Sequence, residues 1–213
     1  MLTALLVALA QPALAAPLKL IAFGDSLTQG YGLPEAQGLV PQLQDWLGAH
    51  GQEAVTVENA GVSGDTSAGG ASRIGWTLAG GGDAIIVELG GNDLLRGIPP
   101  ETTRANLDAV MKAASDKGLP ILLIGLPAPA NYGPDYQKQF DAIYPALAAK
   151  YQAMLIPDYF APLRAKTDRT QAMAAYMQPD GIHPNAEGVK VIVASLGPKV
   201  VALLKQVHQS AGN

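Results

Sequence analysis

Ser26 is the first residue in the chain whose type and position predict chemistry. It follows Gly24 and Asp25 at the end of an apolar run. A serine in such a tight turn can expose its hydroxyl, and the backbone N–H groups of a following helix can point at the same spot. The same tripeptide also occurs in ordinary turns and helix caps. A nucleophilic role for Ser26 therefore requires a base elsewhere in the chain.

Three histidines are available as that base. His50 lies in the predicted last turn of a helix, and His208 lies in the polar C-terminal region. His183 lies in residues 179–184, which are too rich in Pro and Gly for a helix interior. Asp180 precedes it in the same turn, so that a carboxylate can hold the imidazole and stabilise the imidazolium that forms when the serine loses its proton. In the alternative interpretation, Asp180 caps the final helix and His183 is solvated.

Two glycine-containing segments after predicted strands supply further candidates. A tetrahedral intermediate needs hydrogen-bond donors for its oxyanion, and backbone N–H groups and side-chain amides are the usual suppliers. Gly64 lets the backbone approach a substrate closely, and Asn92 can donate through Nδ2. Each segment taken alone can equally be a simple turn. The neighbouring acidic residues are interpreted as structural, because short acidic side chains at such turns usually accept backbone hydrogen bonds; they are Asp25, Asp65 and Asp93.

Short apolar runs alternate with longer amphipathic stretches, which is typical of a parallel sheet covered by helices on both faces. In such a sheet, reactive groups gather just beyond the carboxyl ends of the strands, where Ser26, Gly64 and Asn92 are expected. Strands are predicted at residues 18–24, 54–60, 83–90, 120–126 and 153–158. Helices are predicted at residues 39–50, 67–78, 102–117, 135–151 and 186–208.

The composition restricts the class of protein. The 213 residues are 48% hydrophobic and 15% charged, as in a packed α/β protein, and no linker or repeat divides them. Residues 16–213 are therefore predicted to form one domain. The net charge is −4 without a cluster of Lys or Arg, so we expect no nucleic acid partner. The lack of cysteine excludes disulfides, thiolate zinc sites and cysteine nucleophiles.

Residues 1–15 are predicted to be a secretory signal peptide. Residues 1–16 are almost wholly apolar and end in a small-x-small pattern that is typical of cleavage after Ala15. One feature departs from the pattern, because no Lys or Arg precedes Lys19. The run is shorter than the roughly 20 residues that span a bilayer, so we expect no stable membrane span. The alternative is that this segment is an ordinary buried helix.

Serine, glycine, asparagine and Asp-x-x-His in this order resemble the SGNH hydrolase superfamily, also called the GDSL esterases and lipases. The resemblance covers essentially the whole chain after residue 15. It extends to the bacterial branch of exported multifunctional thioesterase, protease and lysophospholipase enzymes and to the similar arylesterases. The matching segments are Gly24-Asp25-Ser26-Leu27, Ser63-Gly64-Asp65-Thr66-Ser67, Val87-Glu88-Leu89-Gly90-Gly91-Asn92-Asp93, Asn131-Tyr132-Gly133, Ala142-Ile143-Tyr144-Pro145 and Asp180-Gly181-Ile182-His183-Pro184.

This resemblance implies a flavodoxin-like three-layer α/β/α fold with a central, mostly parallel five-stranded sheet. It implies a serine hydrolase of acyl esters and thioesters that is periplasmic or secreted and uses no metal or other cofactor. Ser26 would be the nucleophile, His183 the base and Asp180 the residue that orients the base. The oxyanion donors would be Ser26 N–H, Gly64 N–H and Asn92 Nδ2. We expect a monomer that acts on small-molecule substrates.

The loops near Ser26 carry mainly aliphatic side chains, which suit an acyl chain better than a sugar. Residues 93–98 are predicted to form a mobile loop that faces the substrate. The same side chains can equally be core residues beneath the loops. The candidate substrate contacts are Leu94, Leu95, Ile98 and Tyr132.

Two rival functions stay open at this point. One is a carbohydrate acetyl esterase of the same superfamily. A sugar site would more often show stacked aromatic residues, whereas Trp46 and Trp76 both lie within predicted helices. The other is an inactive exported protein that binds lipid. The presence of all four residues of the pattern argues against it, because a protein that only binds lipid does not need the serine, asparagine, aspartate and histidine together.

Overall fold

The computed structural model describes residues 17–165 and 169–210. Its centre is a sheet of five parallel strands in the order β2-β1-β3-β4-β5. All the predicted strands and their parallel arrangement are confirmed. The predicted signal peptide at residues 1–15 lies outside the described residues. The strands are β1 (Leu18–Gly24), β2 (Val55–Gly61), β3 (Ala84–Glu88), β4 (Ile121–Ile124) and β5 (Met154–Ile156).

The central strands consist of near-continuous apolar runs because both of their faces are covered. Every residue of β3 and β4 is buried, and β1 is buried from Leu20 to its end. The edge strands β2 and β5 are partly exposed. Continuous rather than alternating burial is the pattern expected for a parallel sheet between two helical layers.

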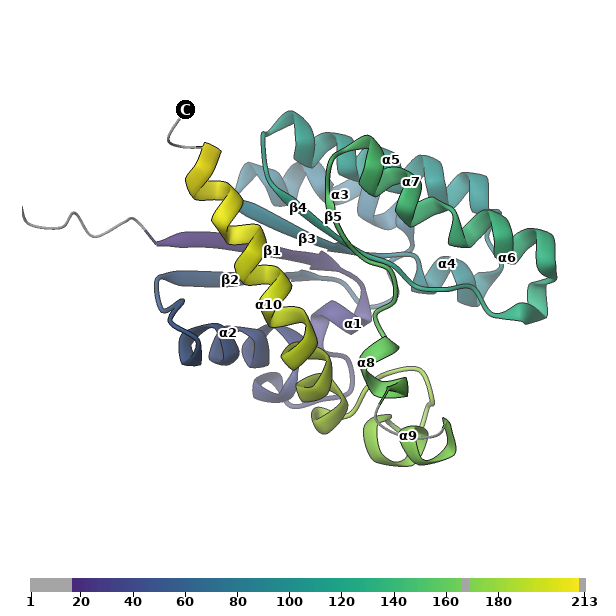
Figure 1. Ribbon diagram of the computed structural model, residues 1–213. Coiled ribbons are helices and arrows are strands. Elements are labelled where there is room, and N and C mark those ends of the chain that lie inside the picture. The colour runs from purple at the N-terminus through teal and green to yellow at the C-terminus, as the bar shows by residue number, and fades with distance from the viewer. Residues whose placement is uncertain (1–16, 166–168, 211–213) are drawn as a thin grey trace, which may run out of the picture.

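Helices cover both faces of the sheet (Figure 1), which confirms the predicted three-layer α/β/α fold. Each long helix turns an apolar stripe to the sheet. In α5, the buried residues Leu107, Val110, Met111 and Ala114 recur at the spacing of one helix face. One layer is α2 (Leu39–Ala49) and α10 (Ala186–Ser210), and the other is α3 (Ser67–Ala79), α5 (Pro100–Asp116), α6 (Pro134–Asp141) and α7 (Ile143–Lys150).

Shorter helices lie in the connections and build most of the site. They were not predicted as separate elements, because helices of about one or two turns are too short to show apolar periodicity in the sequence. They are α1 (Ser26–Gln29), α4 (Gly91–Arg96), α8 (Ala161–Arg164), α9 (Arg169–Tyr176) and the 3₁₀ turns η1 (Glu35–Gln37) and η2 (Ala130–Tyr132).

The single helix predicted at residues 135–151 is wrong, because the chain breaks at Ala142 into α6 and α7. Pro145 explains the break. It has no N–H to donate to the Asp141 carbonyl one turn earlier, and its ring would clash with that carbonyl in a continuous helix.

The loop predicted at residues 93–98 is also wrong, because Gly91–Arg96 form helix α4. Two glycines in the left-handed region bracket this helix, Gly90 with φ 119° and Gly97 with φ 62°. Glycine adopts these angles without steric cost, which lets a short helix begin and end sharply. Asn92 therefore lies in the first turn of a helix.

The strand order places the carboxyl ends of β1 and β3 side by side at a switch point in the topology. The chain leaves β1 for β2 on one side and returns to β3 on the other side. Ligand sites of open α/β sheets form in the crevice at such a point. Ser26 follows β1 and Asn92 follows β3, so the topology brings both to this crevice.

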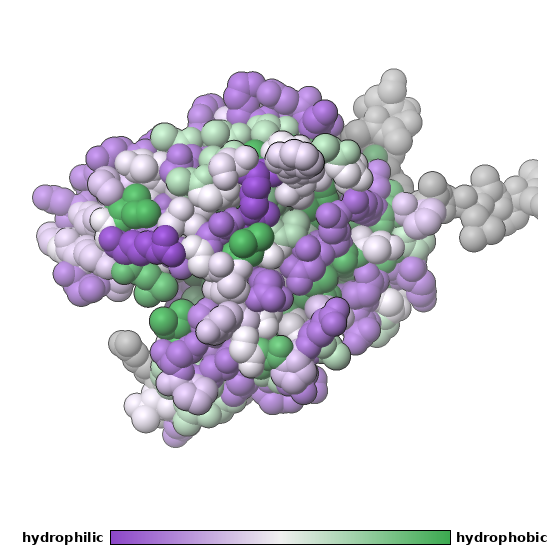
Figure 2. Space-filling view, turned by 180° about the vertical axis from the view of Figure 1, so that it is seen from behind, coloured by the Kyte–Doolittle hydropathy of each residue, from purple (hydrophilic) through white to green (hydrophobic). Residues whose placement is uncertain are grey.

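The surface is that of an ordinary folded domain. In the view from behind, hydrophobic side chains form small groups separated by hydrophilic ones (Figure 2). Among the helices of residues 17–165 and 169–210, none is both long and apolar enough to cross a membrane.

Candidate active site

Ser26 is presented by the turn between β1 and α1. Asp25 is the N-cap of α1, and its Oδ1 accepts a hydrogen bond of 3.0 Å from the Leu27 N–H. The cap makes Ser26 the first residue of the helix, so that its own N–H has no acceptor within the helix. Gly30 ends the helix in the left-handed conformation. The turn thus holds a serine hydroxyl and an available N–H group together at the carboxyl end of a central strand.

Gly24 is required by the packing beneath this turn. A Cβ on Gly24 would lie 2.0 Å from Thr28 Oγ1 and 2.6 Å from the Glu88 carbonyl oxygen. The Thr28 hydroxyl occupies that space because it donates a hydrogen bond of 3.0 Å to Glu88 Oε2. The glycine before Ser26 therefore allows β1, α1 and β3 to approach closely.

The side chain of His183 contacts both Ser26 and Asp180. Its Nε2 lies 2.8 Å from Ser26 Oγ, and its Nδ1 lies 2.6 Å from Asp180 Oδ2. An ionised carboxylate only accepts hydrogen bonds, so Nδ1 carries the proton and Nε2 presents its lone pair to the serine hydroxyl. This is the tautomer that can accept a proton from Ser26.

Asp180 is held by a tight turn of its own loop. Its Oδ1 accepts hydrogen bonds from the backbone N–H groups of Ile182 at 2.9 Å and His183 at 3.0 Å. Slight burial acts to raise the pKa of Asp180, but these bonds and the bond from the His183 ring lower that pKa to about 2. The carboxylate is therefore ionised at neutral pH. Helix α10 begins only at Ala186, so the structure shows Asp180 against the imidazole rather than at the cap of that helix.

The loop before α10 is tied to the turn after α1. Gln178 Nε2 donates to the carbonyl of Tyr31 over 2.8 Å and to that of Pro184 over 3.0 Å. The Tyr31 ring packs against the His183 ring, with 4.8 Å between the centroids. Sequence reasoning missed Tyr31 and Gln178. Neither belongs to a chemical pattern, and the hydrogen bond between them joins positions 147 residues apart.

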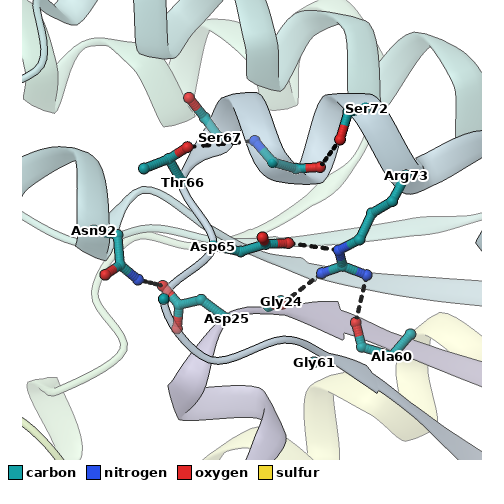
Figure 3. Close-up of polar contacts among 12 residues, drawn as sticks. Gly24, Asp25, Ala60, Gly61, Asp65, Thr66, Ser67, Ser72, Arg73 and Asn92 are labelled. Carbon is teal, nitrogen blue, oxygen red and sulfur yellow. Dashed lines mark hydrogen bonds and ion pairs between the residues drawn. The ribbon is translucent and has the colours of Figure 1, made fainter.

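Gly64 and Asn92, the two expected oxyanion donors after β2 and β3, are linked through α4. Gly64 has a left-handed φ of 83°, and its carbonyl accepts a hydrogen bond of 2.9 Å from Arg96 Nη2. Asn92 lies one turn before Arg96, and its Nδ2 donates to Asp25 Oδ2 over 3.3 Å (Figure 3). Ser26 and Asn92 line the same cavity.

The acidic residues Asp65 and Asp93 make structural contacts. Asp65 Oδ2 pairs with Arg73 Nε over 2.5 Å, and the same guanidinium donates to two carbonyls at the ends of β1 and β2 (Figure 3). Asp93 is buried and accepts hydrogen bonds from the N–H and hydroxyl of Ser67 and from the hydroxyl of Thr103. The Asp65 bond holds the loop before α3 to that helix, and the Asp93 bonds join α4 to α3 and α5.

A cavity of about 870 Å³ opens beside Ser26, with walls that are mainly apolar. Of the candidate substrate contacts, Leu94, Leu95 and Tyr132 line it. Ile98 is not among the described lining residues, and its carbonyl instead accepts a hydrogen bond of 2.9 Å from the Tyr136 hydroxyl. Sequence reasoning missed the opposite wall, which comes from the segments around α8, α9 and the His183 loop. The apolar residues of that wall are Phe160, Leu163, Ala172, Met173, Met177 and Ile182.

Comparison with known proteins extends these observations. The profile of the GDSL-like lipase/acylhydrolase family matches residues 22–191. The chain is 38% identical over 191 residues to the esterase TesA of Pseudomonas aeruginosa, covering 89% of this chain and 91% of that protein. It is 37% identical over 170 residues to thioesterase 1/protease 1/lysophospholipase L1 of Escherichia coli, covering 79% of this chain and 76% of that protein.

A solved structure also indicates an SGNH hydrolase. The crystal structure of AlinE4, an SGNH-hydrolase family esterase, matches with a TM-score of 0.71 at 41% identity, covering 90% of this chain and 99% of that chain. The family match includes the Ser26 turn and the Asp180 to His183 turn. The chain therefore belongs to the GDSL-like lipase/acylhydrolase family of SGNH hydrolases and is a serine ester hydrolase.

Proposed function

We propose that Ser26 is the nucleophile of this hydrolase, with His183 as its general base and Asp180 as the residue that orients the base. The observation that carries the proposal is the pair of His183 contacts, 2.8 Å from Nε2 to Ser26 Oγ and 2.6 Å from Nδ1 to Asp180 Oδ2. A nucleophile, a base and an orienting carboxylate in hydrogen-bonding contact form the arrangement that activates a serine.

In the first half of the reaction, Ser26 Oγ attacks the carbonyl carbon of the substrate while His183 Nε2 takes the hydroxyl proton. The carbonyl oxygen becomes an oxyanion, which accepts hydrogen bonds from Ser26 N–H, Gly64 N–H and Asn92 Nδ2. The bond to the leaving group then breaks, and His183 gives its proton to the departing alcohol or thiol. The acyl group stays on Ser26 as an ester.

In the second half, His183 removes a proton from a water molecule that attacks the acyl-enzyme. The bond between the acyl carbon and Ser26 Oγ breaks, and the proton returns to the serine. The carboxylic acid leaves the site. Asp180 remains ionised throughout and stabilises the imidazolium of each half-reaction, which its low pKa supports.

The proposed substrates are esters and thioesters with an apolar acyl group, including arylesters, acyl thioesters and lysophospholipids. Two observations support this class. The cavity beside Ser26 is lined mainly by aliphatic, aromatic and methionine side chains. The Escherichia coli relative is named as a thioesterase and lysophospholipase. Leu94, Leu95 and Tyr132 are the proposed contacts on one wall.

Kinetics of Ser26→Ala test the nucleophile. The variant should lose nearly all turnover of p-nitrophenyl esters while its unfolding midpoint stays near that of the wild type. Ser63→Ala is a matched control, because Ser63 is an exposed serine that donates to Gln29 Oε1 and lies outside the proposed chemistry. Wild-type turnover by Ser26→Ala would refute the assignment.

A substrate panel tests the acyl class. p-Nitrophenyl esters of graded chain length, an acyl-CoA, a lysophospholipid and an acetylated glycan should be compared by kcat/KM. We expect the apolar acyl substrates to exceed the glycan. Acetate release from the glycan without activity on longer acyl esters would instead indicate a carbohydrate esterase.

We also propose that residues 1–15 direct export to the periplasm or beyond. Their apolar composition and the small-x-small pattern before Ala16 support this. Sequencing the N-terminus of the protein recovered from outside the cytoplasm should give a start near Ala16. An intact Met1 would refute cleavage.

A further inference from the structure

Two carboxyl side chains lie buried beneath Ser26, and the proposed mechanism uses neither of them. Asp25 is 1% exposed, and Glu88 is fully buried at the end of β3, where it pairs in register with Gly24. Within the described residues, neither carboxyl forms an ion pair with Lys or Arg. Burying two unpaired carboxyl groups together is costly, so their contacts should reveal what the pair does.

Asp25 accepts hydrogen bonds at both of its oxygens. Its Oδ1 accepts from Leu27 N–H at 3.0 Å, which caps α1, and its Oδ2 accepts from Asn92 Nδ2 at 3.3 Å (Figure 3). A cap needs only the first contact, and a serine or threonine could supply it. The second contact reaches across to α4 and needs a carboxylate-like acceptor at this position.

Glu88, in contrast to Asp25, has one carboxyl oxygen that meets no hydrogen-bond donor in the described part of the chain. Its Oε2 accepts from Thr28 Oγ1 at 3.0 Å, but its Oε1 is buried without a donor among the described residues. An unsatisfied buried acceptor costs roughly 1–3 kcal/mol. A protonated Glu88 removes that cost, because the carboxyl O–H becomes a donor and the neighbouring Asp25 carboxylate is its acceptor.

The pKa shifts of Glu88 and Asp25 agree with a pair of carboxyl groups that shares one proton and one negative charge. Burial raises the pKa of Glu88 well above its ordinary value, and the charge of Asp25 raises it further. Burial also raises the pKa of Asp25 to about 6, against the hydrogen bonds from Leu27 and Asn92 that lower it. The other titratable groups facing the pair are His183, whose charge lowers the pKa of Asp25, and the buried tyrosines Tyr144 and Tyr159.

We propose that Asp25 is a positioning residue for Asn92, held in place by a hydrogen bond from a protonated Glu88. An amide nitrogen carries two protons. The Asp25 carboxylate takes one, which fixes the nitrogen side of the amide toward Ser26 and leaves the other N–H to meet the oxyanion. This inference rests on the proposed function, in which Asn92 Nδ2 is an oxyanion donor.

A double-mutant cycle tests the proposal. Asn92→Ala should lower kcat by about 10²- to 10³-fold, the effect of losing one oxyanion donor. Asp25→Asn keeps the cap through Oδ1 but turns an amide nitrogen toward the Asn92 amide, so we expect kcat to fall by about 10- to 100-fold with KM nearly unchanged. In the Asn92→Ala background, adding Asp25→Asn should lower kcat by less than about threefold, because the side chain that Asp25 positions is already gone.

Glu88 supplies a second, conservative comparison. Glu88→Gln replaces the carboxyl proton by an amide N–H and should keep kcat within about threefold of the wild type, whereas Glu88→Leu removes the donor and should lower kcat by about tenfold or more. Asp83→Asn is the matched control, because Asp83 accepts from Lys19 N–H at the opposite end of β3. Its kcat should match the wild type.

The outcomes separate the inference from the proposed function. If Asp25→Asn keeps wild-type kcat, the positioning role is refuted. It is also refuted if Asp25→Asn lowers kcat by the same factor in the Asn92→Ala background as in the wild type. If Asn92→Ala itself keeps wild-type kcat, the oxyanion assignment fails instead. Should Asp25→Asn not fold, Glu88→Leu takes its place in the cycle, and a fall in kcat that is fully additive with Asn92→Ala refutes the proposal.

Discussion

His183 Nε2 lies 2.8 Å from Ser26 Oγ, although 157 residues separate the two in the chain. Local features at both ends create this contact. The Asp25 cap fixes the turn that carries Ser26, and two backbone hydrogen bonds to Asp180 fix the turn that carries His183. The long-range hydrogen bonds of Gln178 then hold the two turns together.

Asp180→Asn should lower kcat by about 10³- to 10⁴-fold while the fold is retained. The amide can still accept from the backbone of its turn, but its nitrogen would face Nδ1 of His183. The imidazole would then carry its proton on Nε2 and could not take the proton of Ser26. Steady-state kinetics with a p-nitrophenyl ester measure the effect. Asp116→Asn, on an exposed part of α5, is the control and should behave as wild type. A kcat for Asp180→Asn within tenfold of the wild type contradicts the orienting role.

The buried carboxyl pair should make the protein less stable as pH rises. Burial raises the pKa of Asp25 from 3.8 to about 6, so between those values the folded protein binds more protons than the unfolded chain. The free energy of unfolding therefore decreases as pH rises through this window. The pKa of Glu88 is raised too, by burial and by Asp25, and adds to the effect at higher pH.

Glu88→Gln tests this linkage. Glutamine needs no proton uptake on folding, so the urea midpoint of the variant should exceed that of the wild type at pH 8, and the difference should shrink at pH 5. The measurement is urea unfolding of both proteins at the two pH values. A midpoint for Glu88→Gln below that of the wild type at pH 8 would show that the ionised carboxyl stabilises the fold.

Two glycine substitutions should change stability in opposite directions. Gly24→Ala places a Cβ 2.6 Å from the Glu88 carbonyl oxygen, a backbone atom that cannot move aside, and should cost about 1–3 kcal/mol or more. Gly48→Ala lies within α2, where a Cβ meets no atom within 4 Å, and should stabilise by about 0.5–1 kcal/mol. Thermal or urea unfolding compares them. Equal midpoints for the two variants would contradict the packing described beneath Ser26.

Filling the cavity should change the preference for acyl chain length. Ala172 is a small buried residue of α9 that lines the cavity. Ala172→Phe should lower kcat/KM for long-chain p-nitrophenyl esters by about tenfold more than for the acetate. Ala68→Phe, at an exposed position on α3, is a control of the same size change. A uniform change across chain lengths would show that the acyl group lies elsewhere.

The sequence was sufficient for the sheet but not for the cavity. Long apolar runs such as β3 and long amphipathic helices such as α5 carry strong periodic signals, and all the strands were found. Short elements carry no such signal, so α4, α8 and α9 were missed. The break at Ala142, which Pro145 explains, was overlooked because the apolar pattern continues across it. The wall that contains Met173 and Met177 arises only when α9 packs near the His183 loop, which no local pattern encodes.

The candidate catalytic residues could be proposed from the sequence for a different reason. Chemistry restricts them to few types, and with three histidines in the chain the base could be sought by elimination. Supporting residues escape this reasoning. Tyr31 packs on the imidazole but belongs to no chemical pattern in the sequence. Glu88 lies beneath the serine, and although it falls within a segment that matches the family, that match assigned it no role.

Peptide mapping of a fluorophosphonate adduct identifies the nucleophilic serine directly. The probe reacts with an activated serine and marks it covalently. We expect a single adduct on Ser26 in the folded wild-type protein, much slower labelling of His183→Ala, and no adduct on Ser26→Ala. An adduct on another serine, or rapid labelling of Ser26→Ala, would contradict the assignment of Ser26 as the nucleophile.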